Sequence, residues 1–178
     1  MKVMFISDIH GMKTNLGVVK EQFEKRNCDK LVILGDLFYI GPRNKMGEDY
    51  DIPAVLDFLN SMKDKIICIQ GNCDSDVDGK VCEFPIVKEL GMLSVNGKDI
   101  YLTHGHIYNE DKWKYENTIL MYGHFHLPFI KEKDSNIFMS PGSISLPKGE
   151  DAASYMILEE NTFTIYDVFG NVITEKRI

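Results

Sequence analysis

Residues that bind divalent metal ions gather at five points of this chain, and each point directly follows an apolar run. All five histidines fall into three short clusters, and aspartate or asparagine stands after three of the runs. Imidazole is the commonest metal ligand among side chains, and carboxylate and amide oxygens complement it. The pattern predicts a two-metal centre that cleaves phosphate esters. The residues that we expect to take part are Asp8, His10, Asp36, Asn72, His104, His106, His124 and His126.

Asp36 is the natural ligand to bridge the two ions, because it is a lone carboxylate between the other groups along the chain. Two ions about 3.5–4 Å apart could share a hydroxide and bind both the attacking and the leaving oxygen of a phosphoryl displacement. Two dications carry four positive charges, and Asp8, Asp36 and the hydroxide remove three of them. The remaining positive charge attracts a phosphodiester monoanion, so no protein nucleophile is required.

The donor atoms also indicate which ions fit this site. Carboxylate, imidazole and amide groups favour hard or borderline ions over the soft ions that thiolates select. We expect two divalent ions, with Mn²⁺ as the first choice and Fe²⁺, Zn²⁺ or Ni²⁺ as alternatives.

The first half of the chain has the pattern of strands that alternate with helices. Amphipathic segments predict helices over Asn15–Arg26 and Ala54–Met62, and Pro53 suits the first turn of the second one. Continuous apolar strands between such helices indicate right-handed parallel βαβ units. The three apolar runs of strand length are Val3–Ile6, Leu31–Leu34 and Ile66–Ile69.

The second half has the pattern of a β-rich structure. Asn96-Gly97 predicts a tight hairpin between Met92–Val95 and Ile100–Thr103. We expect this half to be mainly antiparallel, and residues 1–178 to form a single α/β domain of two sheets with helices outside. The further short apolar runs are Ile119–Tyr122, Ile137–Met139, Ser154–Leu158 and Thr162–Val168.

The order of strands and polar residues predicts where the metal centre lies. Ligands of open α/β sheets bind beyond the carboxyl ends of the strands. Five apolar runs end in Asp, Asn or His, so their ends should converge on one site. Glycines next to these residues, such as Gly35 and Gly123, let the backbone turn sharply there.

Composition and charge exclude several classes of protein. The 178 residues are 44% apolar and carry a net charge of −7 without a Lys/Arg stripe, which argues against stable binding to a nucleic-acid polymer. No apolar run approaches the ~18 residues of a membrane-spanning helix, and the first residues lack the pattern of a signal peptide. Four cysteines without a CxxC pair fit reduced thiols. We therefore expect a cytoplasmic protein with a small substrate and no membrane contact.

Five motifs, taken in order, resemble the signature of the calcineurin-like metallophosphoesterase superfamily, and most closely its YfcE-type bacterial phosphodiesterase subgroup. The family pattern is D-x-H, G-D, G-N-[HC]-[DE], H-x-H and G-H-x-H. The corresponding residues are Asp8-Ile9-His10, Gly35-Asp36, Gly71-Asn72-Cys73-Asp74, His104-Gly105-His106 and Gly123-His124-Phe125-His126. Further matches to the subgroup are Gly41-Pro42-Arg43-Asn44 and Pro141-Gly142-Ser143.

The resemblance implies a four-layer α/β/β/α sandwich of two mixed sheets flanked by helices, with a dinuclear centre between the loops. It also implies how the ligands divide between the ions, with His106 just outside them. One ion is held by Asp8, His10, Asp36 and His126. The other is held by Asp36, Asn72, His104 and His124.

Three further residues are candidates for direct roles in catalysis. Cys73 stands where many members of the superfamily have a histidine that can protonate the leaving group, and a neutral thiol is a poorer acid. His106 could take over this task if the substrate lies near it. Arg43 could grip a phosphate oxygen with two hydrogen bonds, or cap loop carbonyls instead. Lys148 stands where the resemblance leads us to expect arginine.

Two other functions remain possible interpretations of the same sequence. A phosphomonoesterase that acts on a nucleotide or sugar phosphate would need more positive charge at the site, from Arg43 or Lys148. A non-catalytic scaffold of the same fold should have lost ligands, whereas all seven predicted ligands are present. A homo-oligomer, either a dimer or a tetramer, is compatible with each function.

Overall fold

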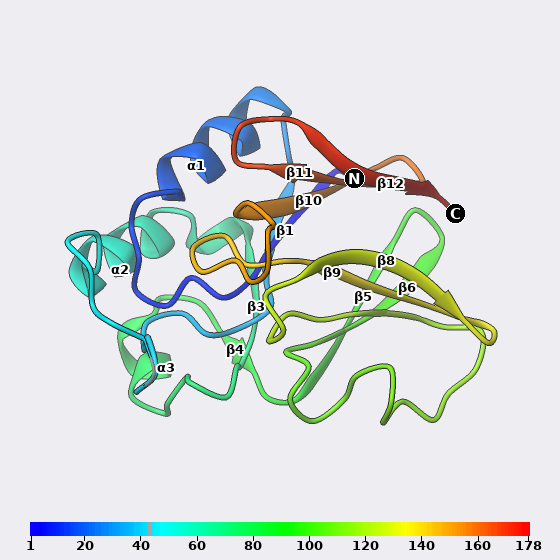
Figure 1. Ribbon diagram of the computed structural model, residues 1–178, viewed down its shortest axis with the longest axis horizontal. Helices are drawn as coiled ribbons and strands as arrows, with labels where there is room; N and C mark the ends of the chain where they lie inside the picture. The colour runs from blue at the N-terminus through cyan, green and yellow to red at the C-terminus, as the bar shows by residue number, and fades with distance from the viewer. Residues whose placement is uncertain (43) are drawn as a thin grey trace.

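The strands of the protein form two mixed sheets that pack face to face, in a computed structural model that describes residues 1–42 and 44–178 (Figure 1). The larger sheet has seven strands in the order β12-β11-β10-β1-β2-β3-β4. Strands β1 to β4 are parallel to one another, and β10 pairs antiparallel with β1. These strands are β1 Val3–Ile6, β2 Lys30–Ile33, β3 Ile66–Ile69, β4 Ile86–Val87, β10 Ser154–Glu159, β11 Thr162–Asp167 and β12 Val172–Arg177.

The helices of the described chain precede β4 and lie on the outer face of the seven-stranded sheet (Figure 1). The two long helices confirm the predicted ones within a few residues. The Asp51 carboxylate accepts a hydrogen bond from the Ala54 amide at 3.1 Å and caps α2, with Pro53 in its first turn. The helices are α1 Leu16–Lys25, α2 Ile52–Ser61, the 3-10 turn η1 Lys63–Lys65 and α3 Asp78–Val81.

The smaller sheet has five strands in the order β5-β6-β7-β9-β8. Both of its edges are antiparallel hairpins, of which the first, with Asn96-Gly97 at its turn, was predicted. Its centre differs from the prediction, because β7 lies parallel to both β6 and β9. Long connections after β6 and β7 allow these parallel crossovers. The strands are β5 Leu90–Val95, β6 Lys98–Thr103, β7 Ile119–Met121, β8 Pro128–Lys133 and β9 Asn136–Pro141.

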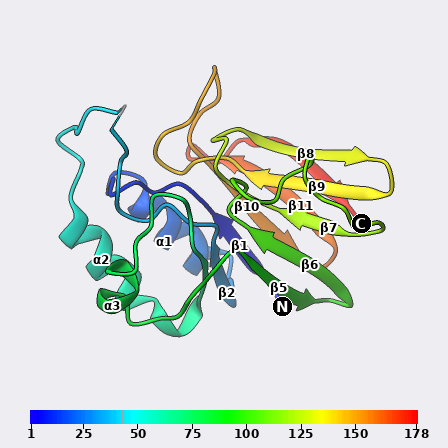
Figure 2. The same cartoon turned by 90° about the horizontal axis from the view of Figure 1, so that it is seen from below.

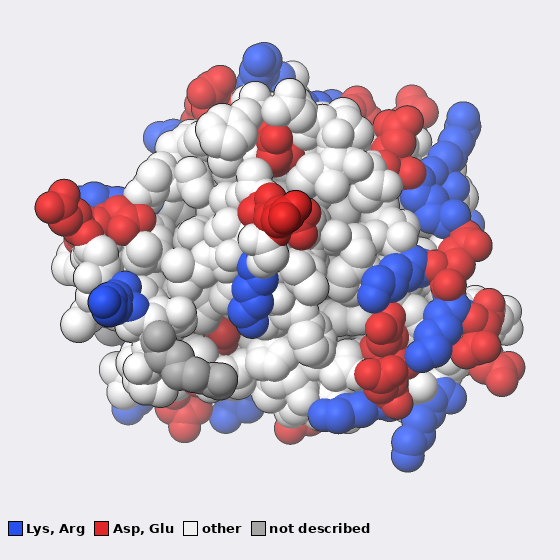
Figure 3. Space-filling model, viewed as in Figure 1, with Lys and Arg blue, Asp and Glu red and all other residues white. Residues whose placement is uncertain are grey.

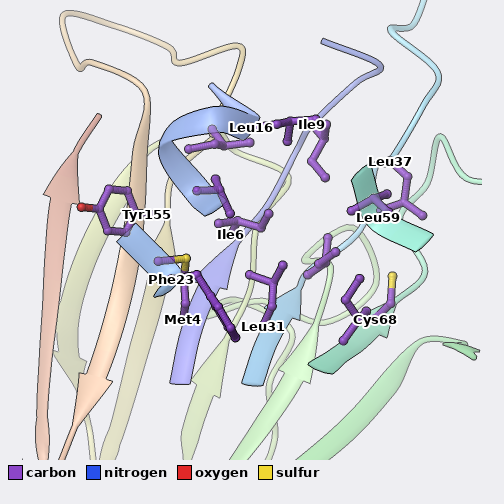
Figure 4. Close-up of a cluster of buried hydrophobic side chains, with 14 of the residues drawn as sticks. Met4, Ile6, Ile9, Leu16, Phe23, Leu31, Leu37, Leu59, Cys68 and Tyr155 are labelled. Carbon is purple, nitrogen blue, oxygen red and sulfur yellow. The ribbon is translucent and has the colours of Figure 1, made fainter. Parts of the chain in front are cut away.

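Alternating side chains of β1 divide between two hydrophobic clusters. Val3 and Phe5 face the second sheet, whereas Met4 and Ile6 face the helices. Figure 4 shows the helix-facing cluster, in which side chains of β1, β2 and β3 meet those of α1 and α2. Because β1 is covered on both faces, its carboxyl end is held firmly between the layers.

The outer face of the five-stranded sheet is covered by an irregular segment, residues 104–118, where the resemblance implies a helical layer. Trp113 of this segment packs against Leu120, Tyr122 and Phe138. The predicted fold class is confirmed, with two mixed sheets and a few helices on the larger one. Within the described residues, no helix is long and apolar enough to cross a membrane.

Candidate metal centre

Most of the predicted ligands lie on strained backbone at the carboxyl ends of strands. A positive φ is uncommon for residues other than glycine and persists only where the surroundings enforce it. Here the loops after β1 and β2 hold each other, since Asp8 N donates to Gly35 O at 3.0 Å and His10 N to Asp36 O at 2.9 Å. The ligand positions with positive φ are Asp8 at 57°, His10 at 52°, Asp36 at 58°, His124 at 66° and His126 at 61°.

Asp8, His10 and His126 form one group of converging donor atoms. Asp8 Oδ1 lies 3.7 Å from His10 Nε2 and 3.3 Å from His126 Nε2, and the two Nε2 atoms are 3.3 Å apart. The Asp8 side chain is fully buried, and its Oδ1 has no hydrogen-bond partner among the described residues. Such an oxygen destabilises the fold unless a cation neutralises it.

Asp36 lies between this group and a second one. Its Oδ2 is 3.6 Å from His10 Nε2 and 3.3 Å from His104 Nε2. Asn72 Oδ1 is 3.1 Å from His104 Nε2, and the ring centre of His124 is 5.1 Å from that of His104. The position of Asp36 is therefore the one that a bridging carboxylate needs.

Three of the histidine rings are oriented by backbone carbonyl groups. Each Nδ1 lies within hydrogen-bond distance of a carbonyl oxygen, so Nδ1 carries a proton and Nε2 is the ring nitrogen that faces the site. Imidazole nitrogens and carboxylate oxygens that face one another need a cation between them, either a proton or a metal ion. The residues present therefore fit divalent cations. The three contacts are His10 with Tyr39 O at 2.7 Å, His104 with Leu34 O at 2.6 Å and His126 with Leu146 O at 2.5 Å.

The electrostatics of the site favour positive charge next to Asp36. Burial alone would raise the pKa of Asp36, but the contact with His104 holds that pKa well below its usual range. Burial likewise opposes the charged form of His104, yet Asp36 and Asp8 raise its pKa to about 9. Burial and the charge of His104 lower the pKa of His124 to about 4, which leaves this ring neutral. Without a metal ion, a proton on His104 supplies the positive charge.

Binding of a divalent cation is expected to release a proton and to strengthen as the pH rises towards 9. Below that pH His104 holds a proton that the cation must displace, and above it His104 has no proton to lose. Each displaced proton changes the apparent affinity by up to about tenfold per pH unit. Calorimetric titration with Mn²⁺ at several pH values, in buffers of different protonation enthalpy, measures both effects. Equal affinity between about pH 6.5 and 8.5 without proton release would contradict this expectation.

Two further residues hold the loops of the site, and both stand in motifs that the sequence analysis identified. The Asp74 carboxylate accepts hydrogen bonds from the amides of Asp36, Leu37 and Gly71 at 2.7–2.8 Å. The Ser143 hydroxyl donates to the carbonyl of Asp8 at 2.8 Å. Asp74 belongs to the G-N-C-D motif and Ser143 to the Pro141-Gly142-Ser143 match, but the contacts that both make with distant loops have no sequence signal.

The metal centre opens into a cavity of about 530 Å³. Figure 2 shows the loops after β2 and β9, in cyan and orange, on the same side of the molecule, and both contribute walls. Cys73 and Lys148 line the cavity, and Arg43 lies outside the described residues. The lining residues are His10, Asp36, Ile40, Gly41, Pro42, Asn44, Asn72, Cys73, His124, His126, Ser145, Leu146, Pro147 and Lys148.

The two described candidates for proton transfer lie on different walls of the site. The Cys73 sulfur lies within 4.8 Å of donor atoms of His10 and Asp36. Burial and the neighbouring Asp36 raise the pKa of the Cys73 thiol to about 12, so it is neutral at pH 7. His106 lines a different cleft, next to Asn72. Burial and His104 lower the pKa of His106.

Comparison with known proteins gives one consistent family. A family model for the calcineurin-like phosphoesterase superfamily domain matches residues 1–162. Phosphodiesterase YfcE of Escherichia coli K12 is 38% identical over 167 residues, which cover 93% of this chain and 91% of that protein. The probable metallophosphoesterase YsnB of Bacillus subtilis is 27% identical, with 98% and 96% covered.

Comparison with solved structures finds the same E. coli phosphoesterase as the sequence comparison. The structure of Yfce, a phosphoesterase from E. coli, matches with a TM-score of 0.95 and 36% identity over the whole of both chains. Vacuolar Protein Sorting 29 from Cryptosporidium parvum matches with a TM-score of 0.63 over 99% of this chain and 98% of that one, but its 18% identity shows a shared fold alone. The chain therefore belongs to the calcineurin-like phosphoesterase superfamily, which confirms the predicted class of enzyme, a phosphoric ester hydrolase.

Proposed function

We propose that residues 1–178 act as a single metallophosphoesterase domain that hydrolyses a small phosphodiester at two divalent metal ions. The observation that carries this proposal is the pair of converging donor groups, with the unpartnered Asp8 Oδ1 in one and Asp36 between them. The relative named phosphodiesterase YfcE supports the choice of a diester.

The proposed ligand sets share Asp36. His104 and His124, like His10 and His126, offer imidazole nitrogen, and Mn²⁺ suits a set that combines such nitrogens with carboxylate and amide oxygens. Bound ions would lower the pKa of a coordinated water and neutralise charge on the phosphoryl group. The proposed ligands are Asp8, His10, Asp36 and His126 for one ion, and Asp36, Asn72, His104 and His124 for the other.

Other residues that line the cavity are proposed to position and select the substrate. Lys148 provides positive charge at the wall of the cavity, and Ile40, Leu146 and Pro147 provide apolar surface. On the face shown in Figure 3, acidic and basic side chains of the described residues are interspersed and form no continuous basic surface. This distribution suits a small substrate better than a nucleic-acid polymer.

Cys73 is proposed to line the reaction site as a neutral group and not to act as a nucleophile. A thiol with a pKa of about 12 is a weak acid and forms almost no thiolate at pH 7. We therefore expect the enzyme to favour esters whose leaving group departs without protonation, such as nitrophenolates.

Purified protein should hydrolyse bis(p-nitrophenyl) phosphate in the presence of Mn²⁺, and a chelator should abolish this activity. The monoester p-nitrophenyl phosphate should react more slowly, because a dianion needs more positive charge than the formal single charge of the site. Faster turnover of the monoester would favour the phosphomonoesterase. Absence of turnover on both esters with any of Mn²⁺, Fe²⁺, Zn²⁺ and Ni²⁺ would refute the proposed function.

A further inference from the structure

A second cleft, of about 420 Å³, adjoins the metal centre on another wall. Asn72 lines both this cleft and the larger cavity. The ring centre of His106 lies 5.4 Å from that of His104 and 6.1 Å from that of His124. A group bound in the cleft would therefore lie close to the proposed metal ligands. We call it the Glu89 cleft, and its lining residues are Gln70, Gly71, Asn72, Lys88, Glu89, His106 and Ile107.

Glu89 lines this cleft from a strained turn between β4 and β5. Its φ is +58°, and the amide of Leu90 donates to the carbonyl of Lys88 at 2.7 Å. This pattern defines a γ-turn of the rare kind with positive φ. Strained backbone of this type clusters at functional sites, where the surrounding structure enforces it.

The same turn occurs at a proposed metal ligand. His124 has a φ of +66°, and the amide of Phe125 donates to the carbonyl of Gly123 at 2.7 Å. One strained turn thus carries a proposed metal ligand, and the other carries a residue that lines the adjoining cleft. Glutamate gains nothing intrinsic from a positive φ, so its side chain is the feature that this turn positions.

The lining of the Glu89 cleft suits hydroxyl groups. A carboxylate accepts hydrogen bonds, whereas the amide of Gln70 and the imidazole of His106 can both donate and accept them. The ammonium of Lys88 lies 3.2 Å from the Asp76 carboxylate on the exposed surface, and Glu89 supplies the carboxylate of the cleft lining. His106 Nδ1 is buried and has no hydrogen-bond partner within the described part of the chain.

The larger cavity offers a second space next to the metal centre. Ile40, Leu146 and Pro147 contribute apolar side chains to its walls, and Lys148 contributes positive charge. A phosphodiester has two substituents on one phosphorus, and the two spaces meet at the metal centre. Each space can therefore hold one of the two substituents.

We propose that the Glu89 cleft holds a hydroxyl-bearing alcohol arm of the phosphodiester, with Glu89 accepting hydrogen bonds from its hydroxyl groups. This inference rests on the proposed function, because it places one arm of a diester bound at the metal centre. It assigns Glu89 as a specificity-determining residue that lies outside the metal ligands.

Two diesters with the same leaving group test this assignment. p-Nitrophenyl glyceryl phosphate carries two hydroxyl groups that p-nitrophenyl propyl phosphate lacks. With Mn²⁺ present, kcat/KM for the glyceryl ester should exceed that for the propyl ester by roughly tenfold or more, because the cleft would leave its polar groups unpaired with the propyl arm. Glu89→Met should bring this ratio to about 1, and Glu89→Gln should retain part of the preference.

A matched control distinguishes the loss of Glu89 from the general effect of removing one negative charge. Glu83→Met removes an exposed glutamate that pairs with Lys63 and lines neither space. This variant should keep the ratio of the unmodified protein. Thermal unfolding of each variant checks that the fold is retained, and Glu89→Gln provides a second test at Glu89 if the methionine variant does not fold.

A binding experiment keeps this inference separate from the proposed function. Glycerol 3-phosphate should bind the Mn²⁺-loaded protein roughly tenfold more tightly than propyl phosphate in calorimetric titration, and Glu89→Met should remove the difference. If that preference holds while neither diester is hydrolysed, the cleft is supported and the proposed function fails. A ratio near 1 in the unmodified protein, or a ratio that survives Glu89→Met, overturns the assignment of the cleft.

Discussion

Asp36→Asn is expected to lower hydrolysis of bis(p-nitrophenyl) phosphate by more than about a hundredfold and to weaken the binding of both metal ions. Residues that merely orient a metal ligand already change affinity or activity by 10–100-fold, and Asp36 is proposed to contact both ions. The amide removes one negative charge at a point 3.3 Å from His104 Nε2 and 3.6 Å from His10 Nε2.

Asp57→Asn is the matched control for this change. It removes the same charge from an exposed position of α2, and it should leave activity and metal content unchanged. Metal content after dialysis against Mn²⁺, together with the rate of diester hydrolysis, measures both effects. Full activity of Asp36→Asn would show that the bridging assignment is wrong.

Gly71→Ala is expected to have the second largest effect, because no space exists for a side chain at this position. An added Cβ would lie less than 3.0 Å from Oδ1 and from the backbone nitrogen of Asp36, where real Cβ atoms are essentially never found. The loop must move, and Asp36 moves with it. We expect a destabilisation of about 1–3 kcal/mol, as is typical of overpacking, together with loss of most of the activity.

Gly79→Ala distinguishes this clash from the general effect of replacing glycine. A Cβ at Gly79 in α3 meets no atom within 4 Å, so alanine should be neutral or stabilising by up to about 1 kcal/mol. Chemical denaturation followed by circular dichroism compares the two variants, and the ester assay compares their rates. Equal stability and equal activity would contradict the close approach of Gly71 to Asp36.

The apolar runs predicted the strands that carry the site, because a strand buried on both faces must be apolar throughout. β1 and β3 have the predicted bounds, and β2 is shifted by one residue towards the N-terminus. The edge strands β4, β8 and β12 were not predicted, whereas the edge strand β5 was. β8 exposes Lys131, Glu132 and Lys133, and such polar edge strands lack the apolar pattern of a buried strand.

The parallel centre of the second sheet was also beyond sequence reasoning. β6, β7 and β9 were each predicted as strands, but the pairing of β7 with β6 and β9 depends on contacts between distant segments. This arrangement matters for function, because it turns the carboxyl ends of β6 and β7 to the same edge. His104 follows β6 and His124 follows β7, so parallel pairing brings these two rings to 5.1 Å between their centres.

The side chains of the site could be predicted from their types and positions, whereas the groups that orient them could not. Every residue type has the same backbone carbonyl group. The contacts of His10 with the carbonyl of Tyr39 and of His126 with that of Leu146 therefore have no sequence signal. Glu89 is similar. Its importance depends on a backbone turn and on the cleft around it, and neither has a motif.

A crystal grown with Mn²⁺ and measured at the manganese absorption edge tests the two-metal centre most directly. We expect two anomalous peaks about 3.5–4 Å apart, both in contact with the Asp36 carboxylate. One should lie against Asp8, His10 and His126, and the other against Asn72, His104 and His124. No peak between these side chains, or a single peak that does not contact Asp36, would contradict the account.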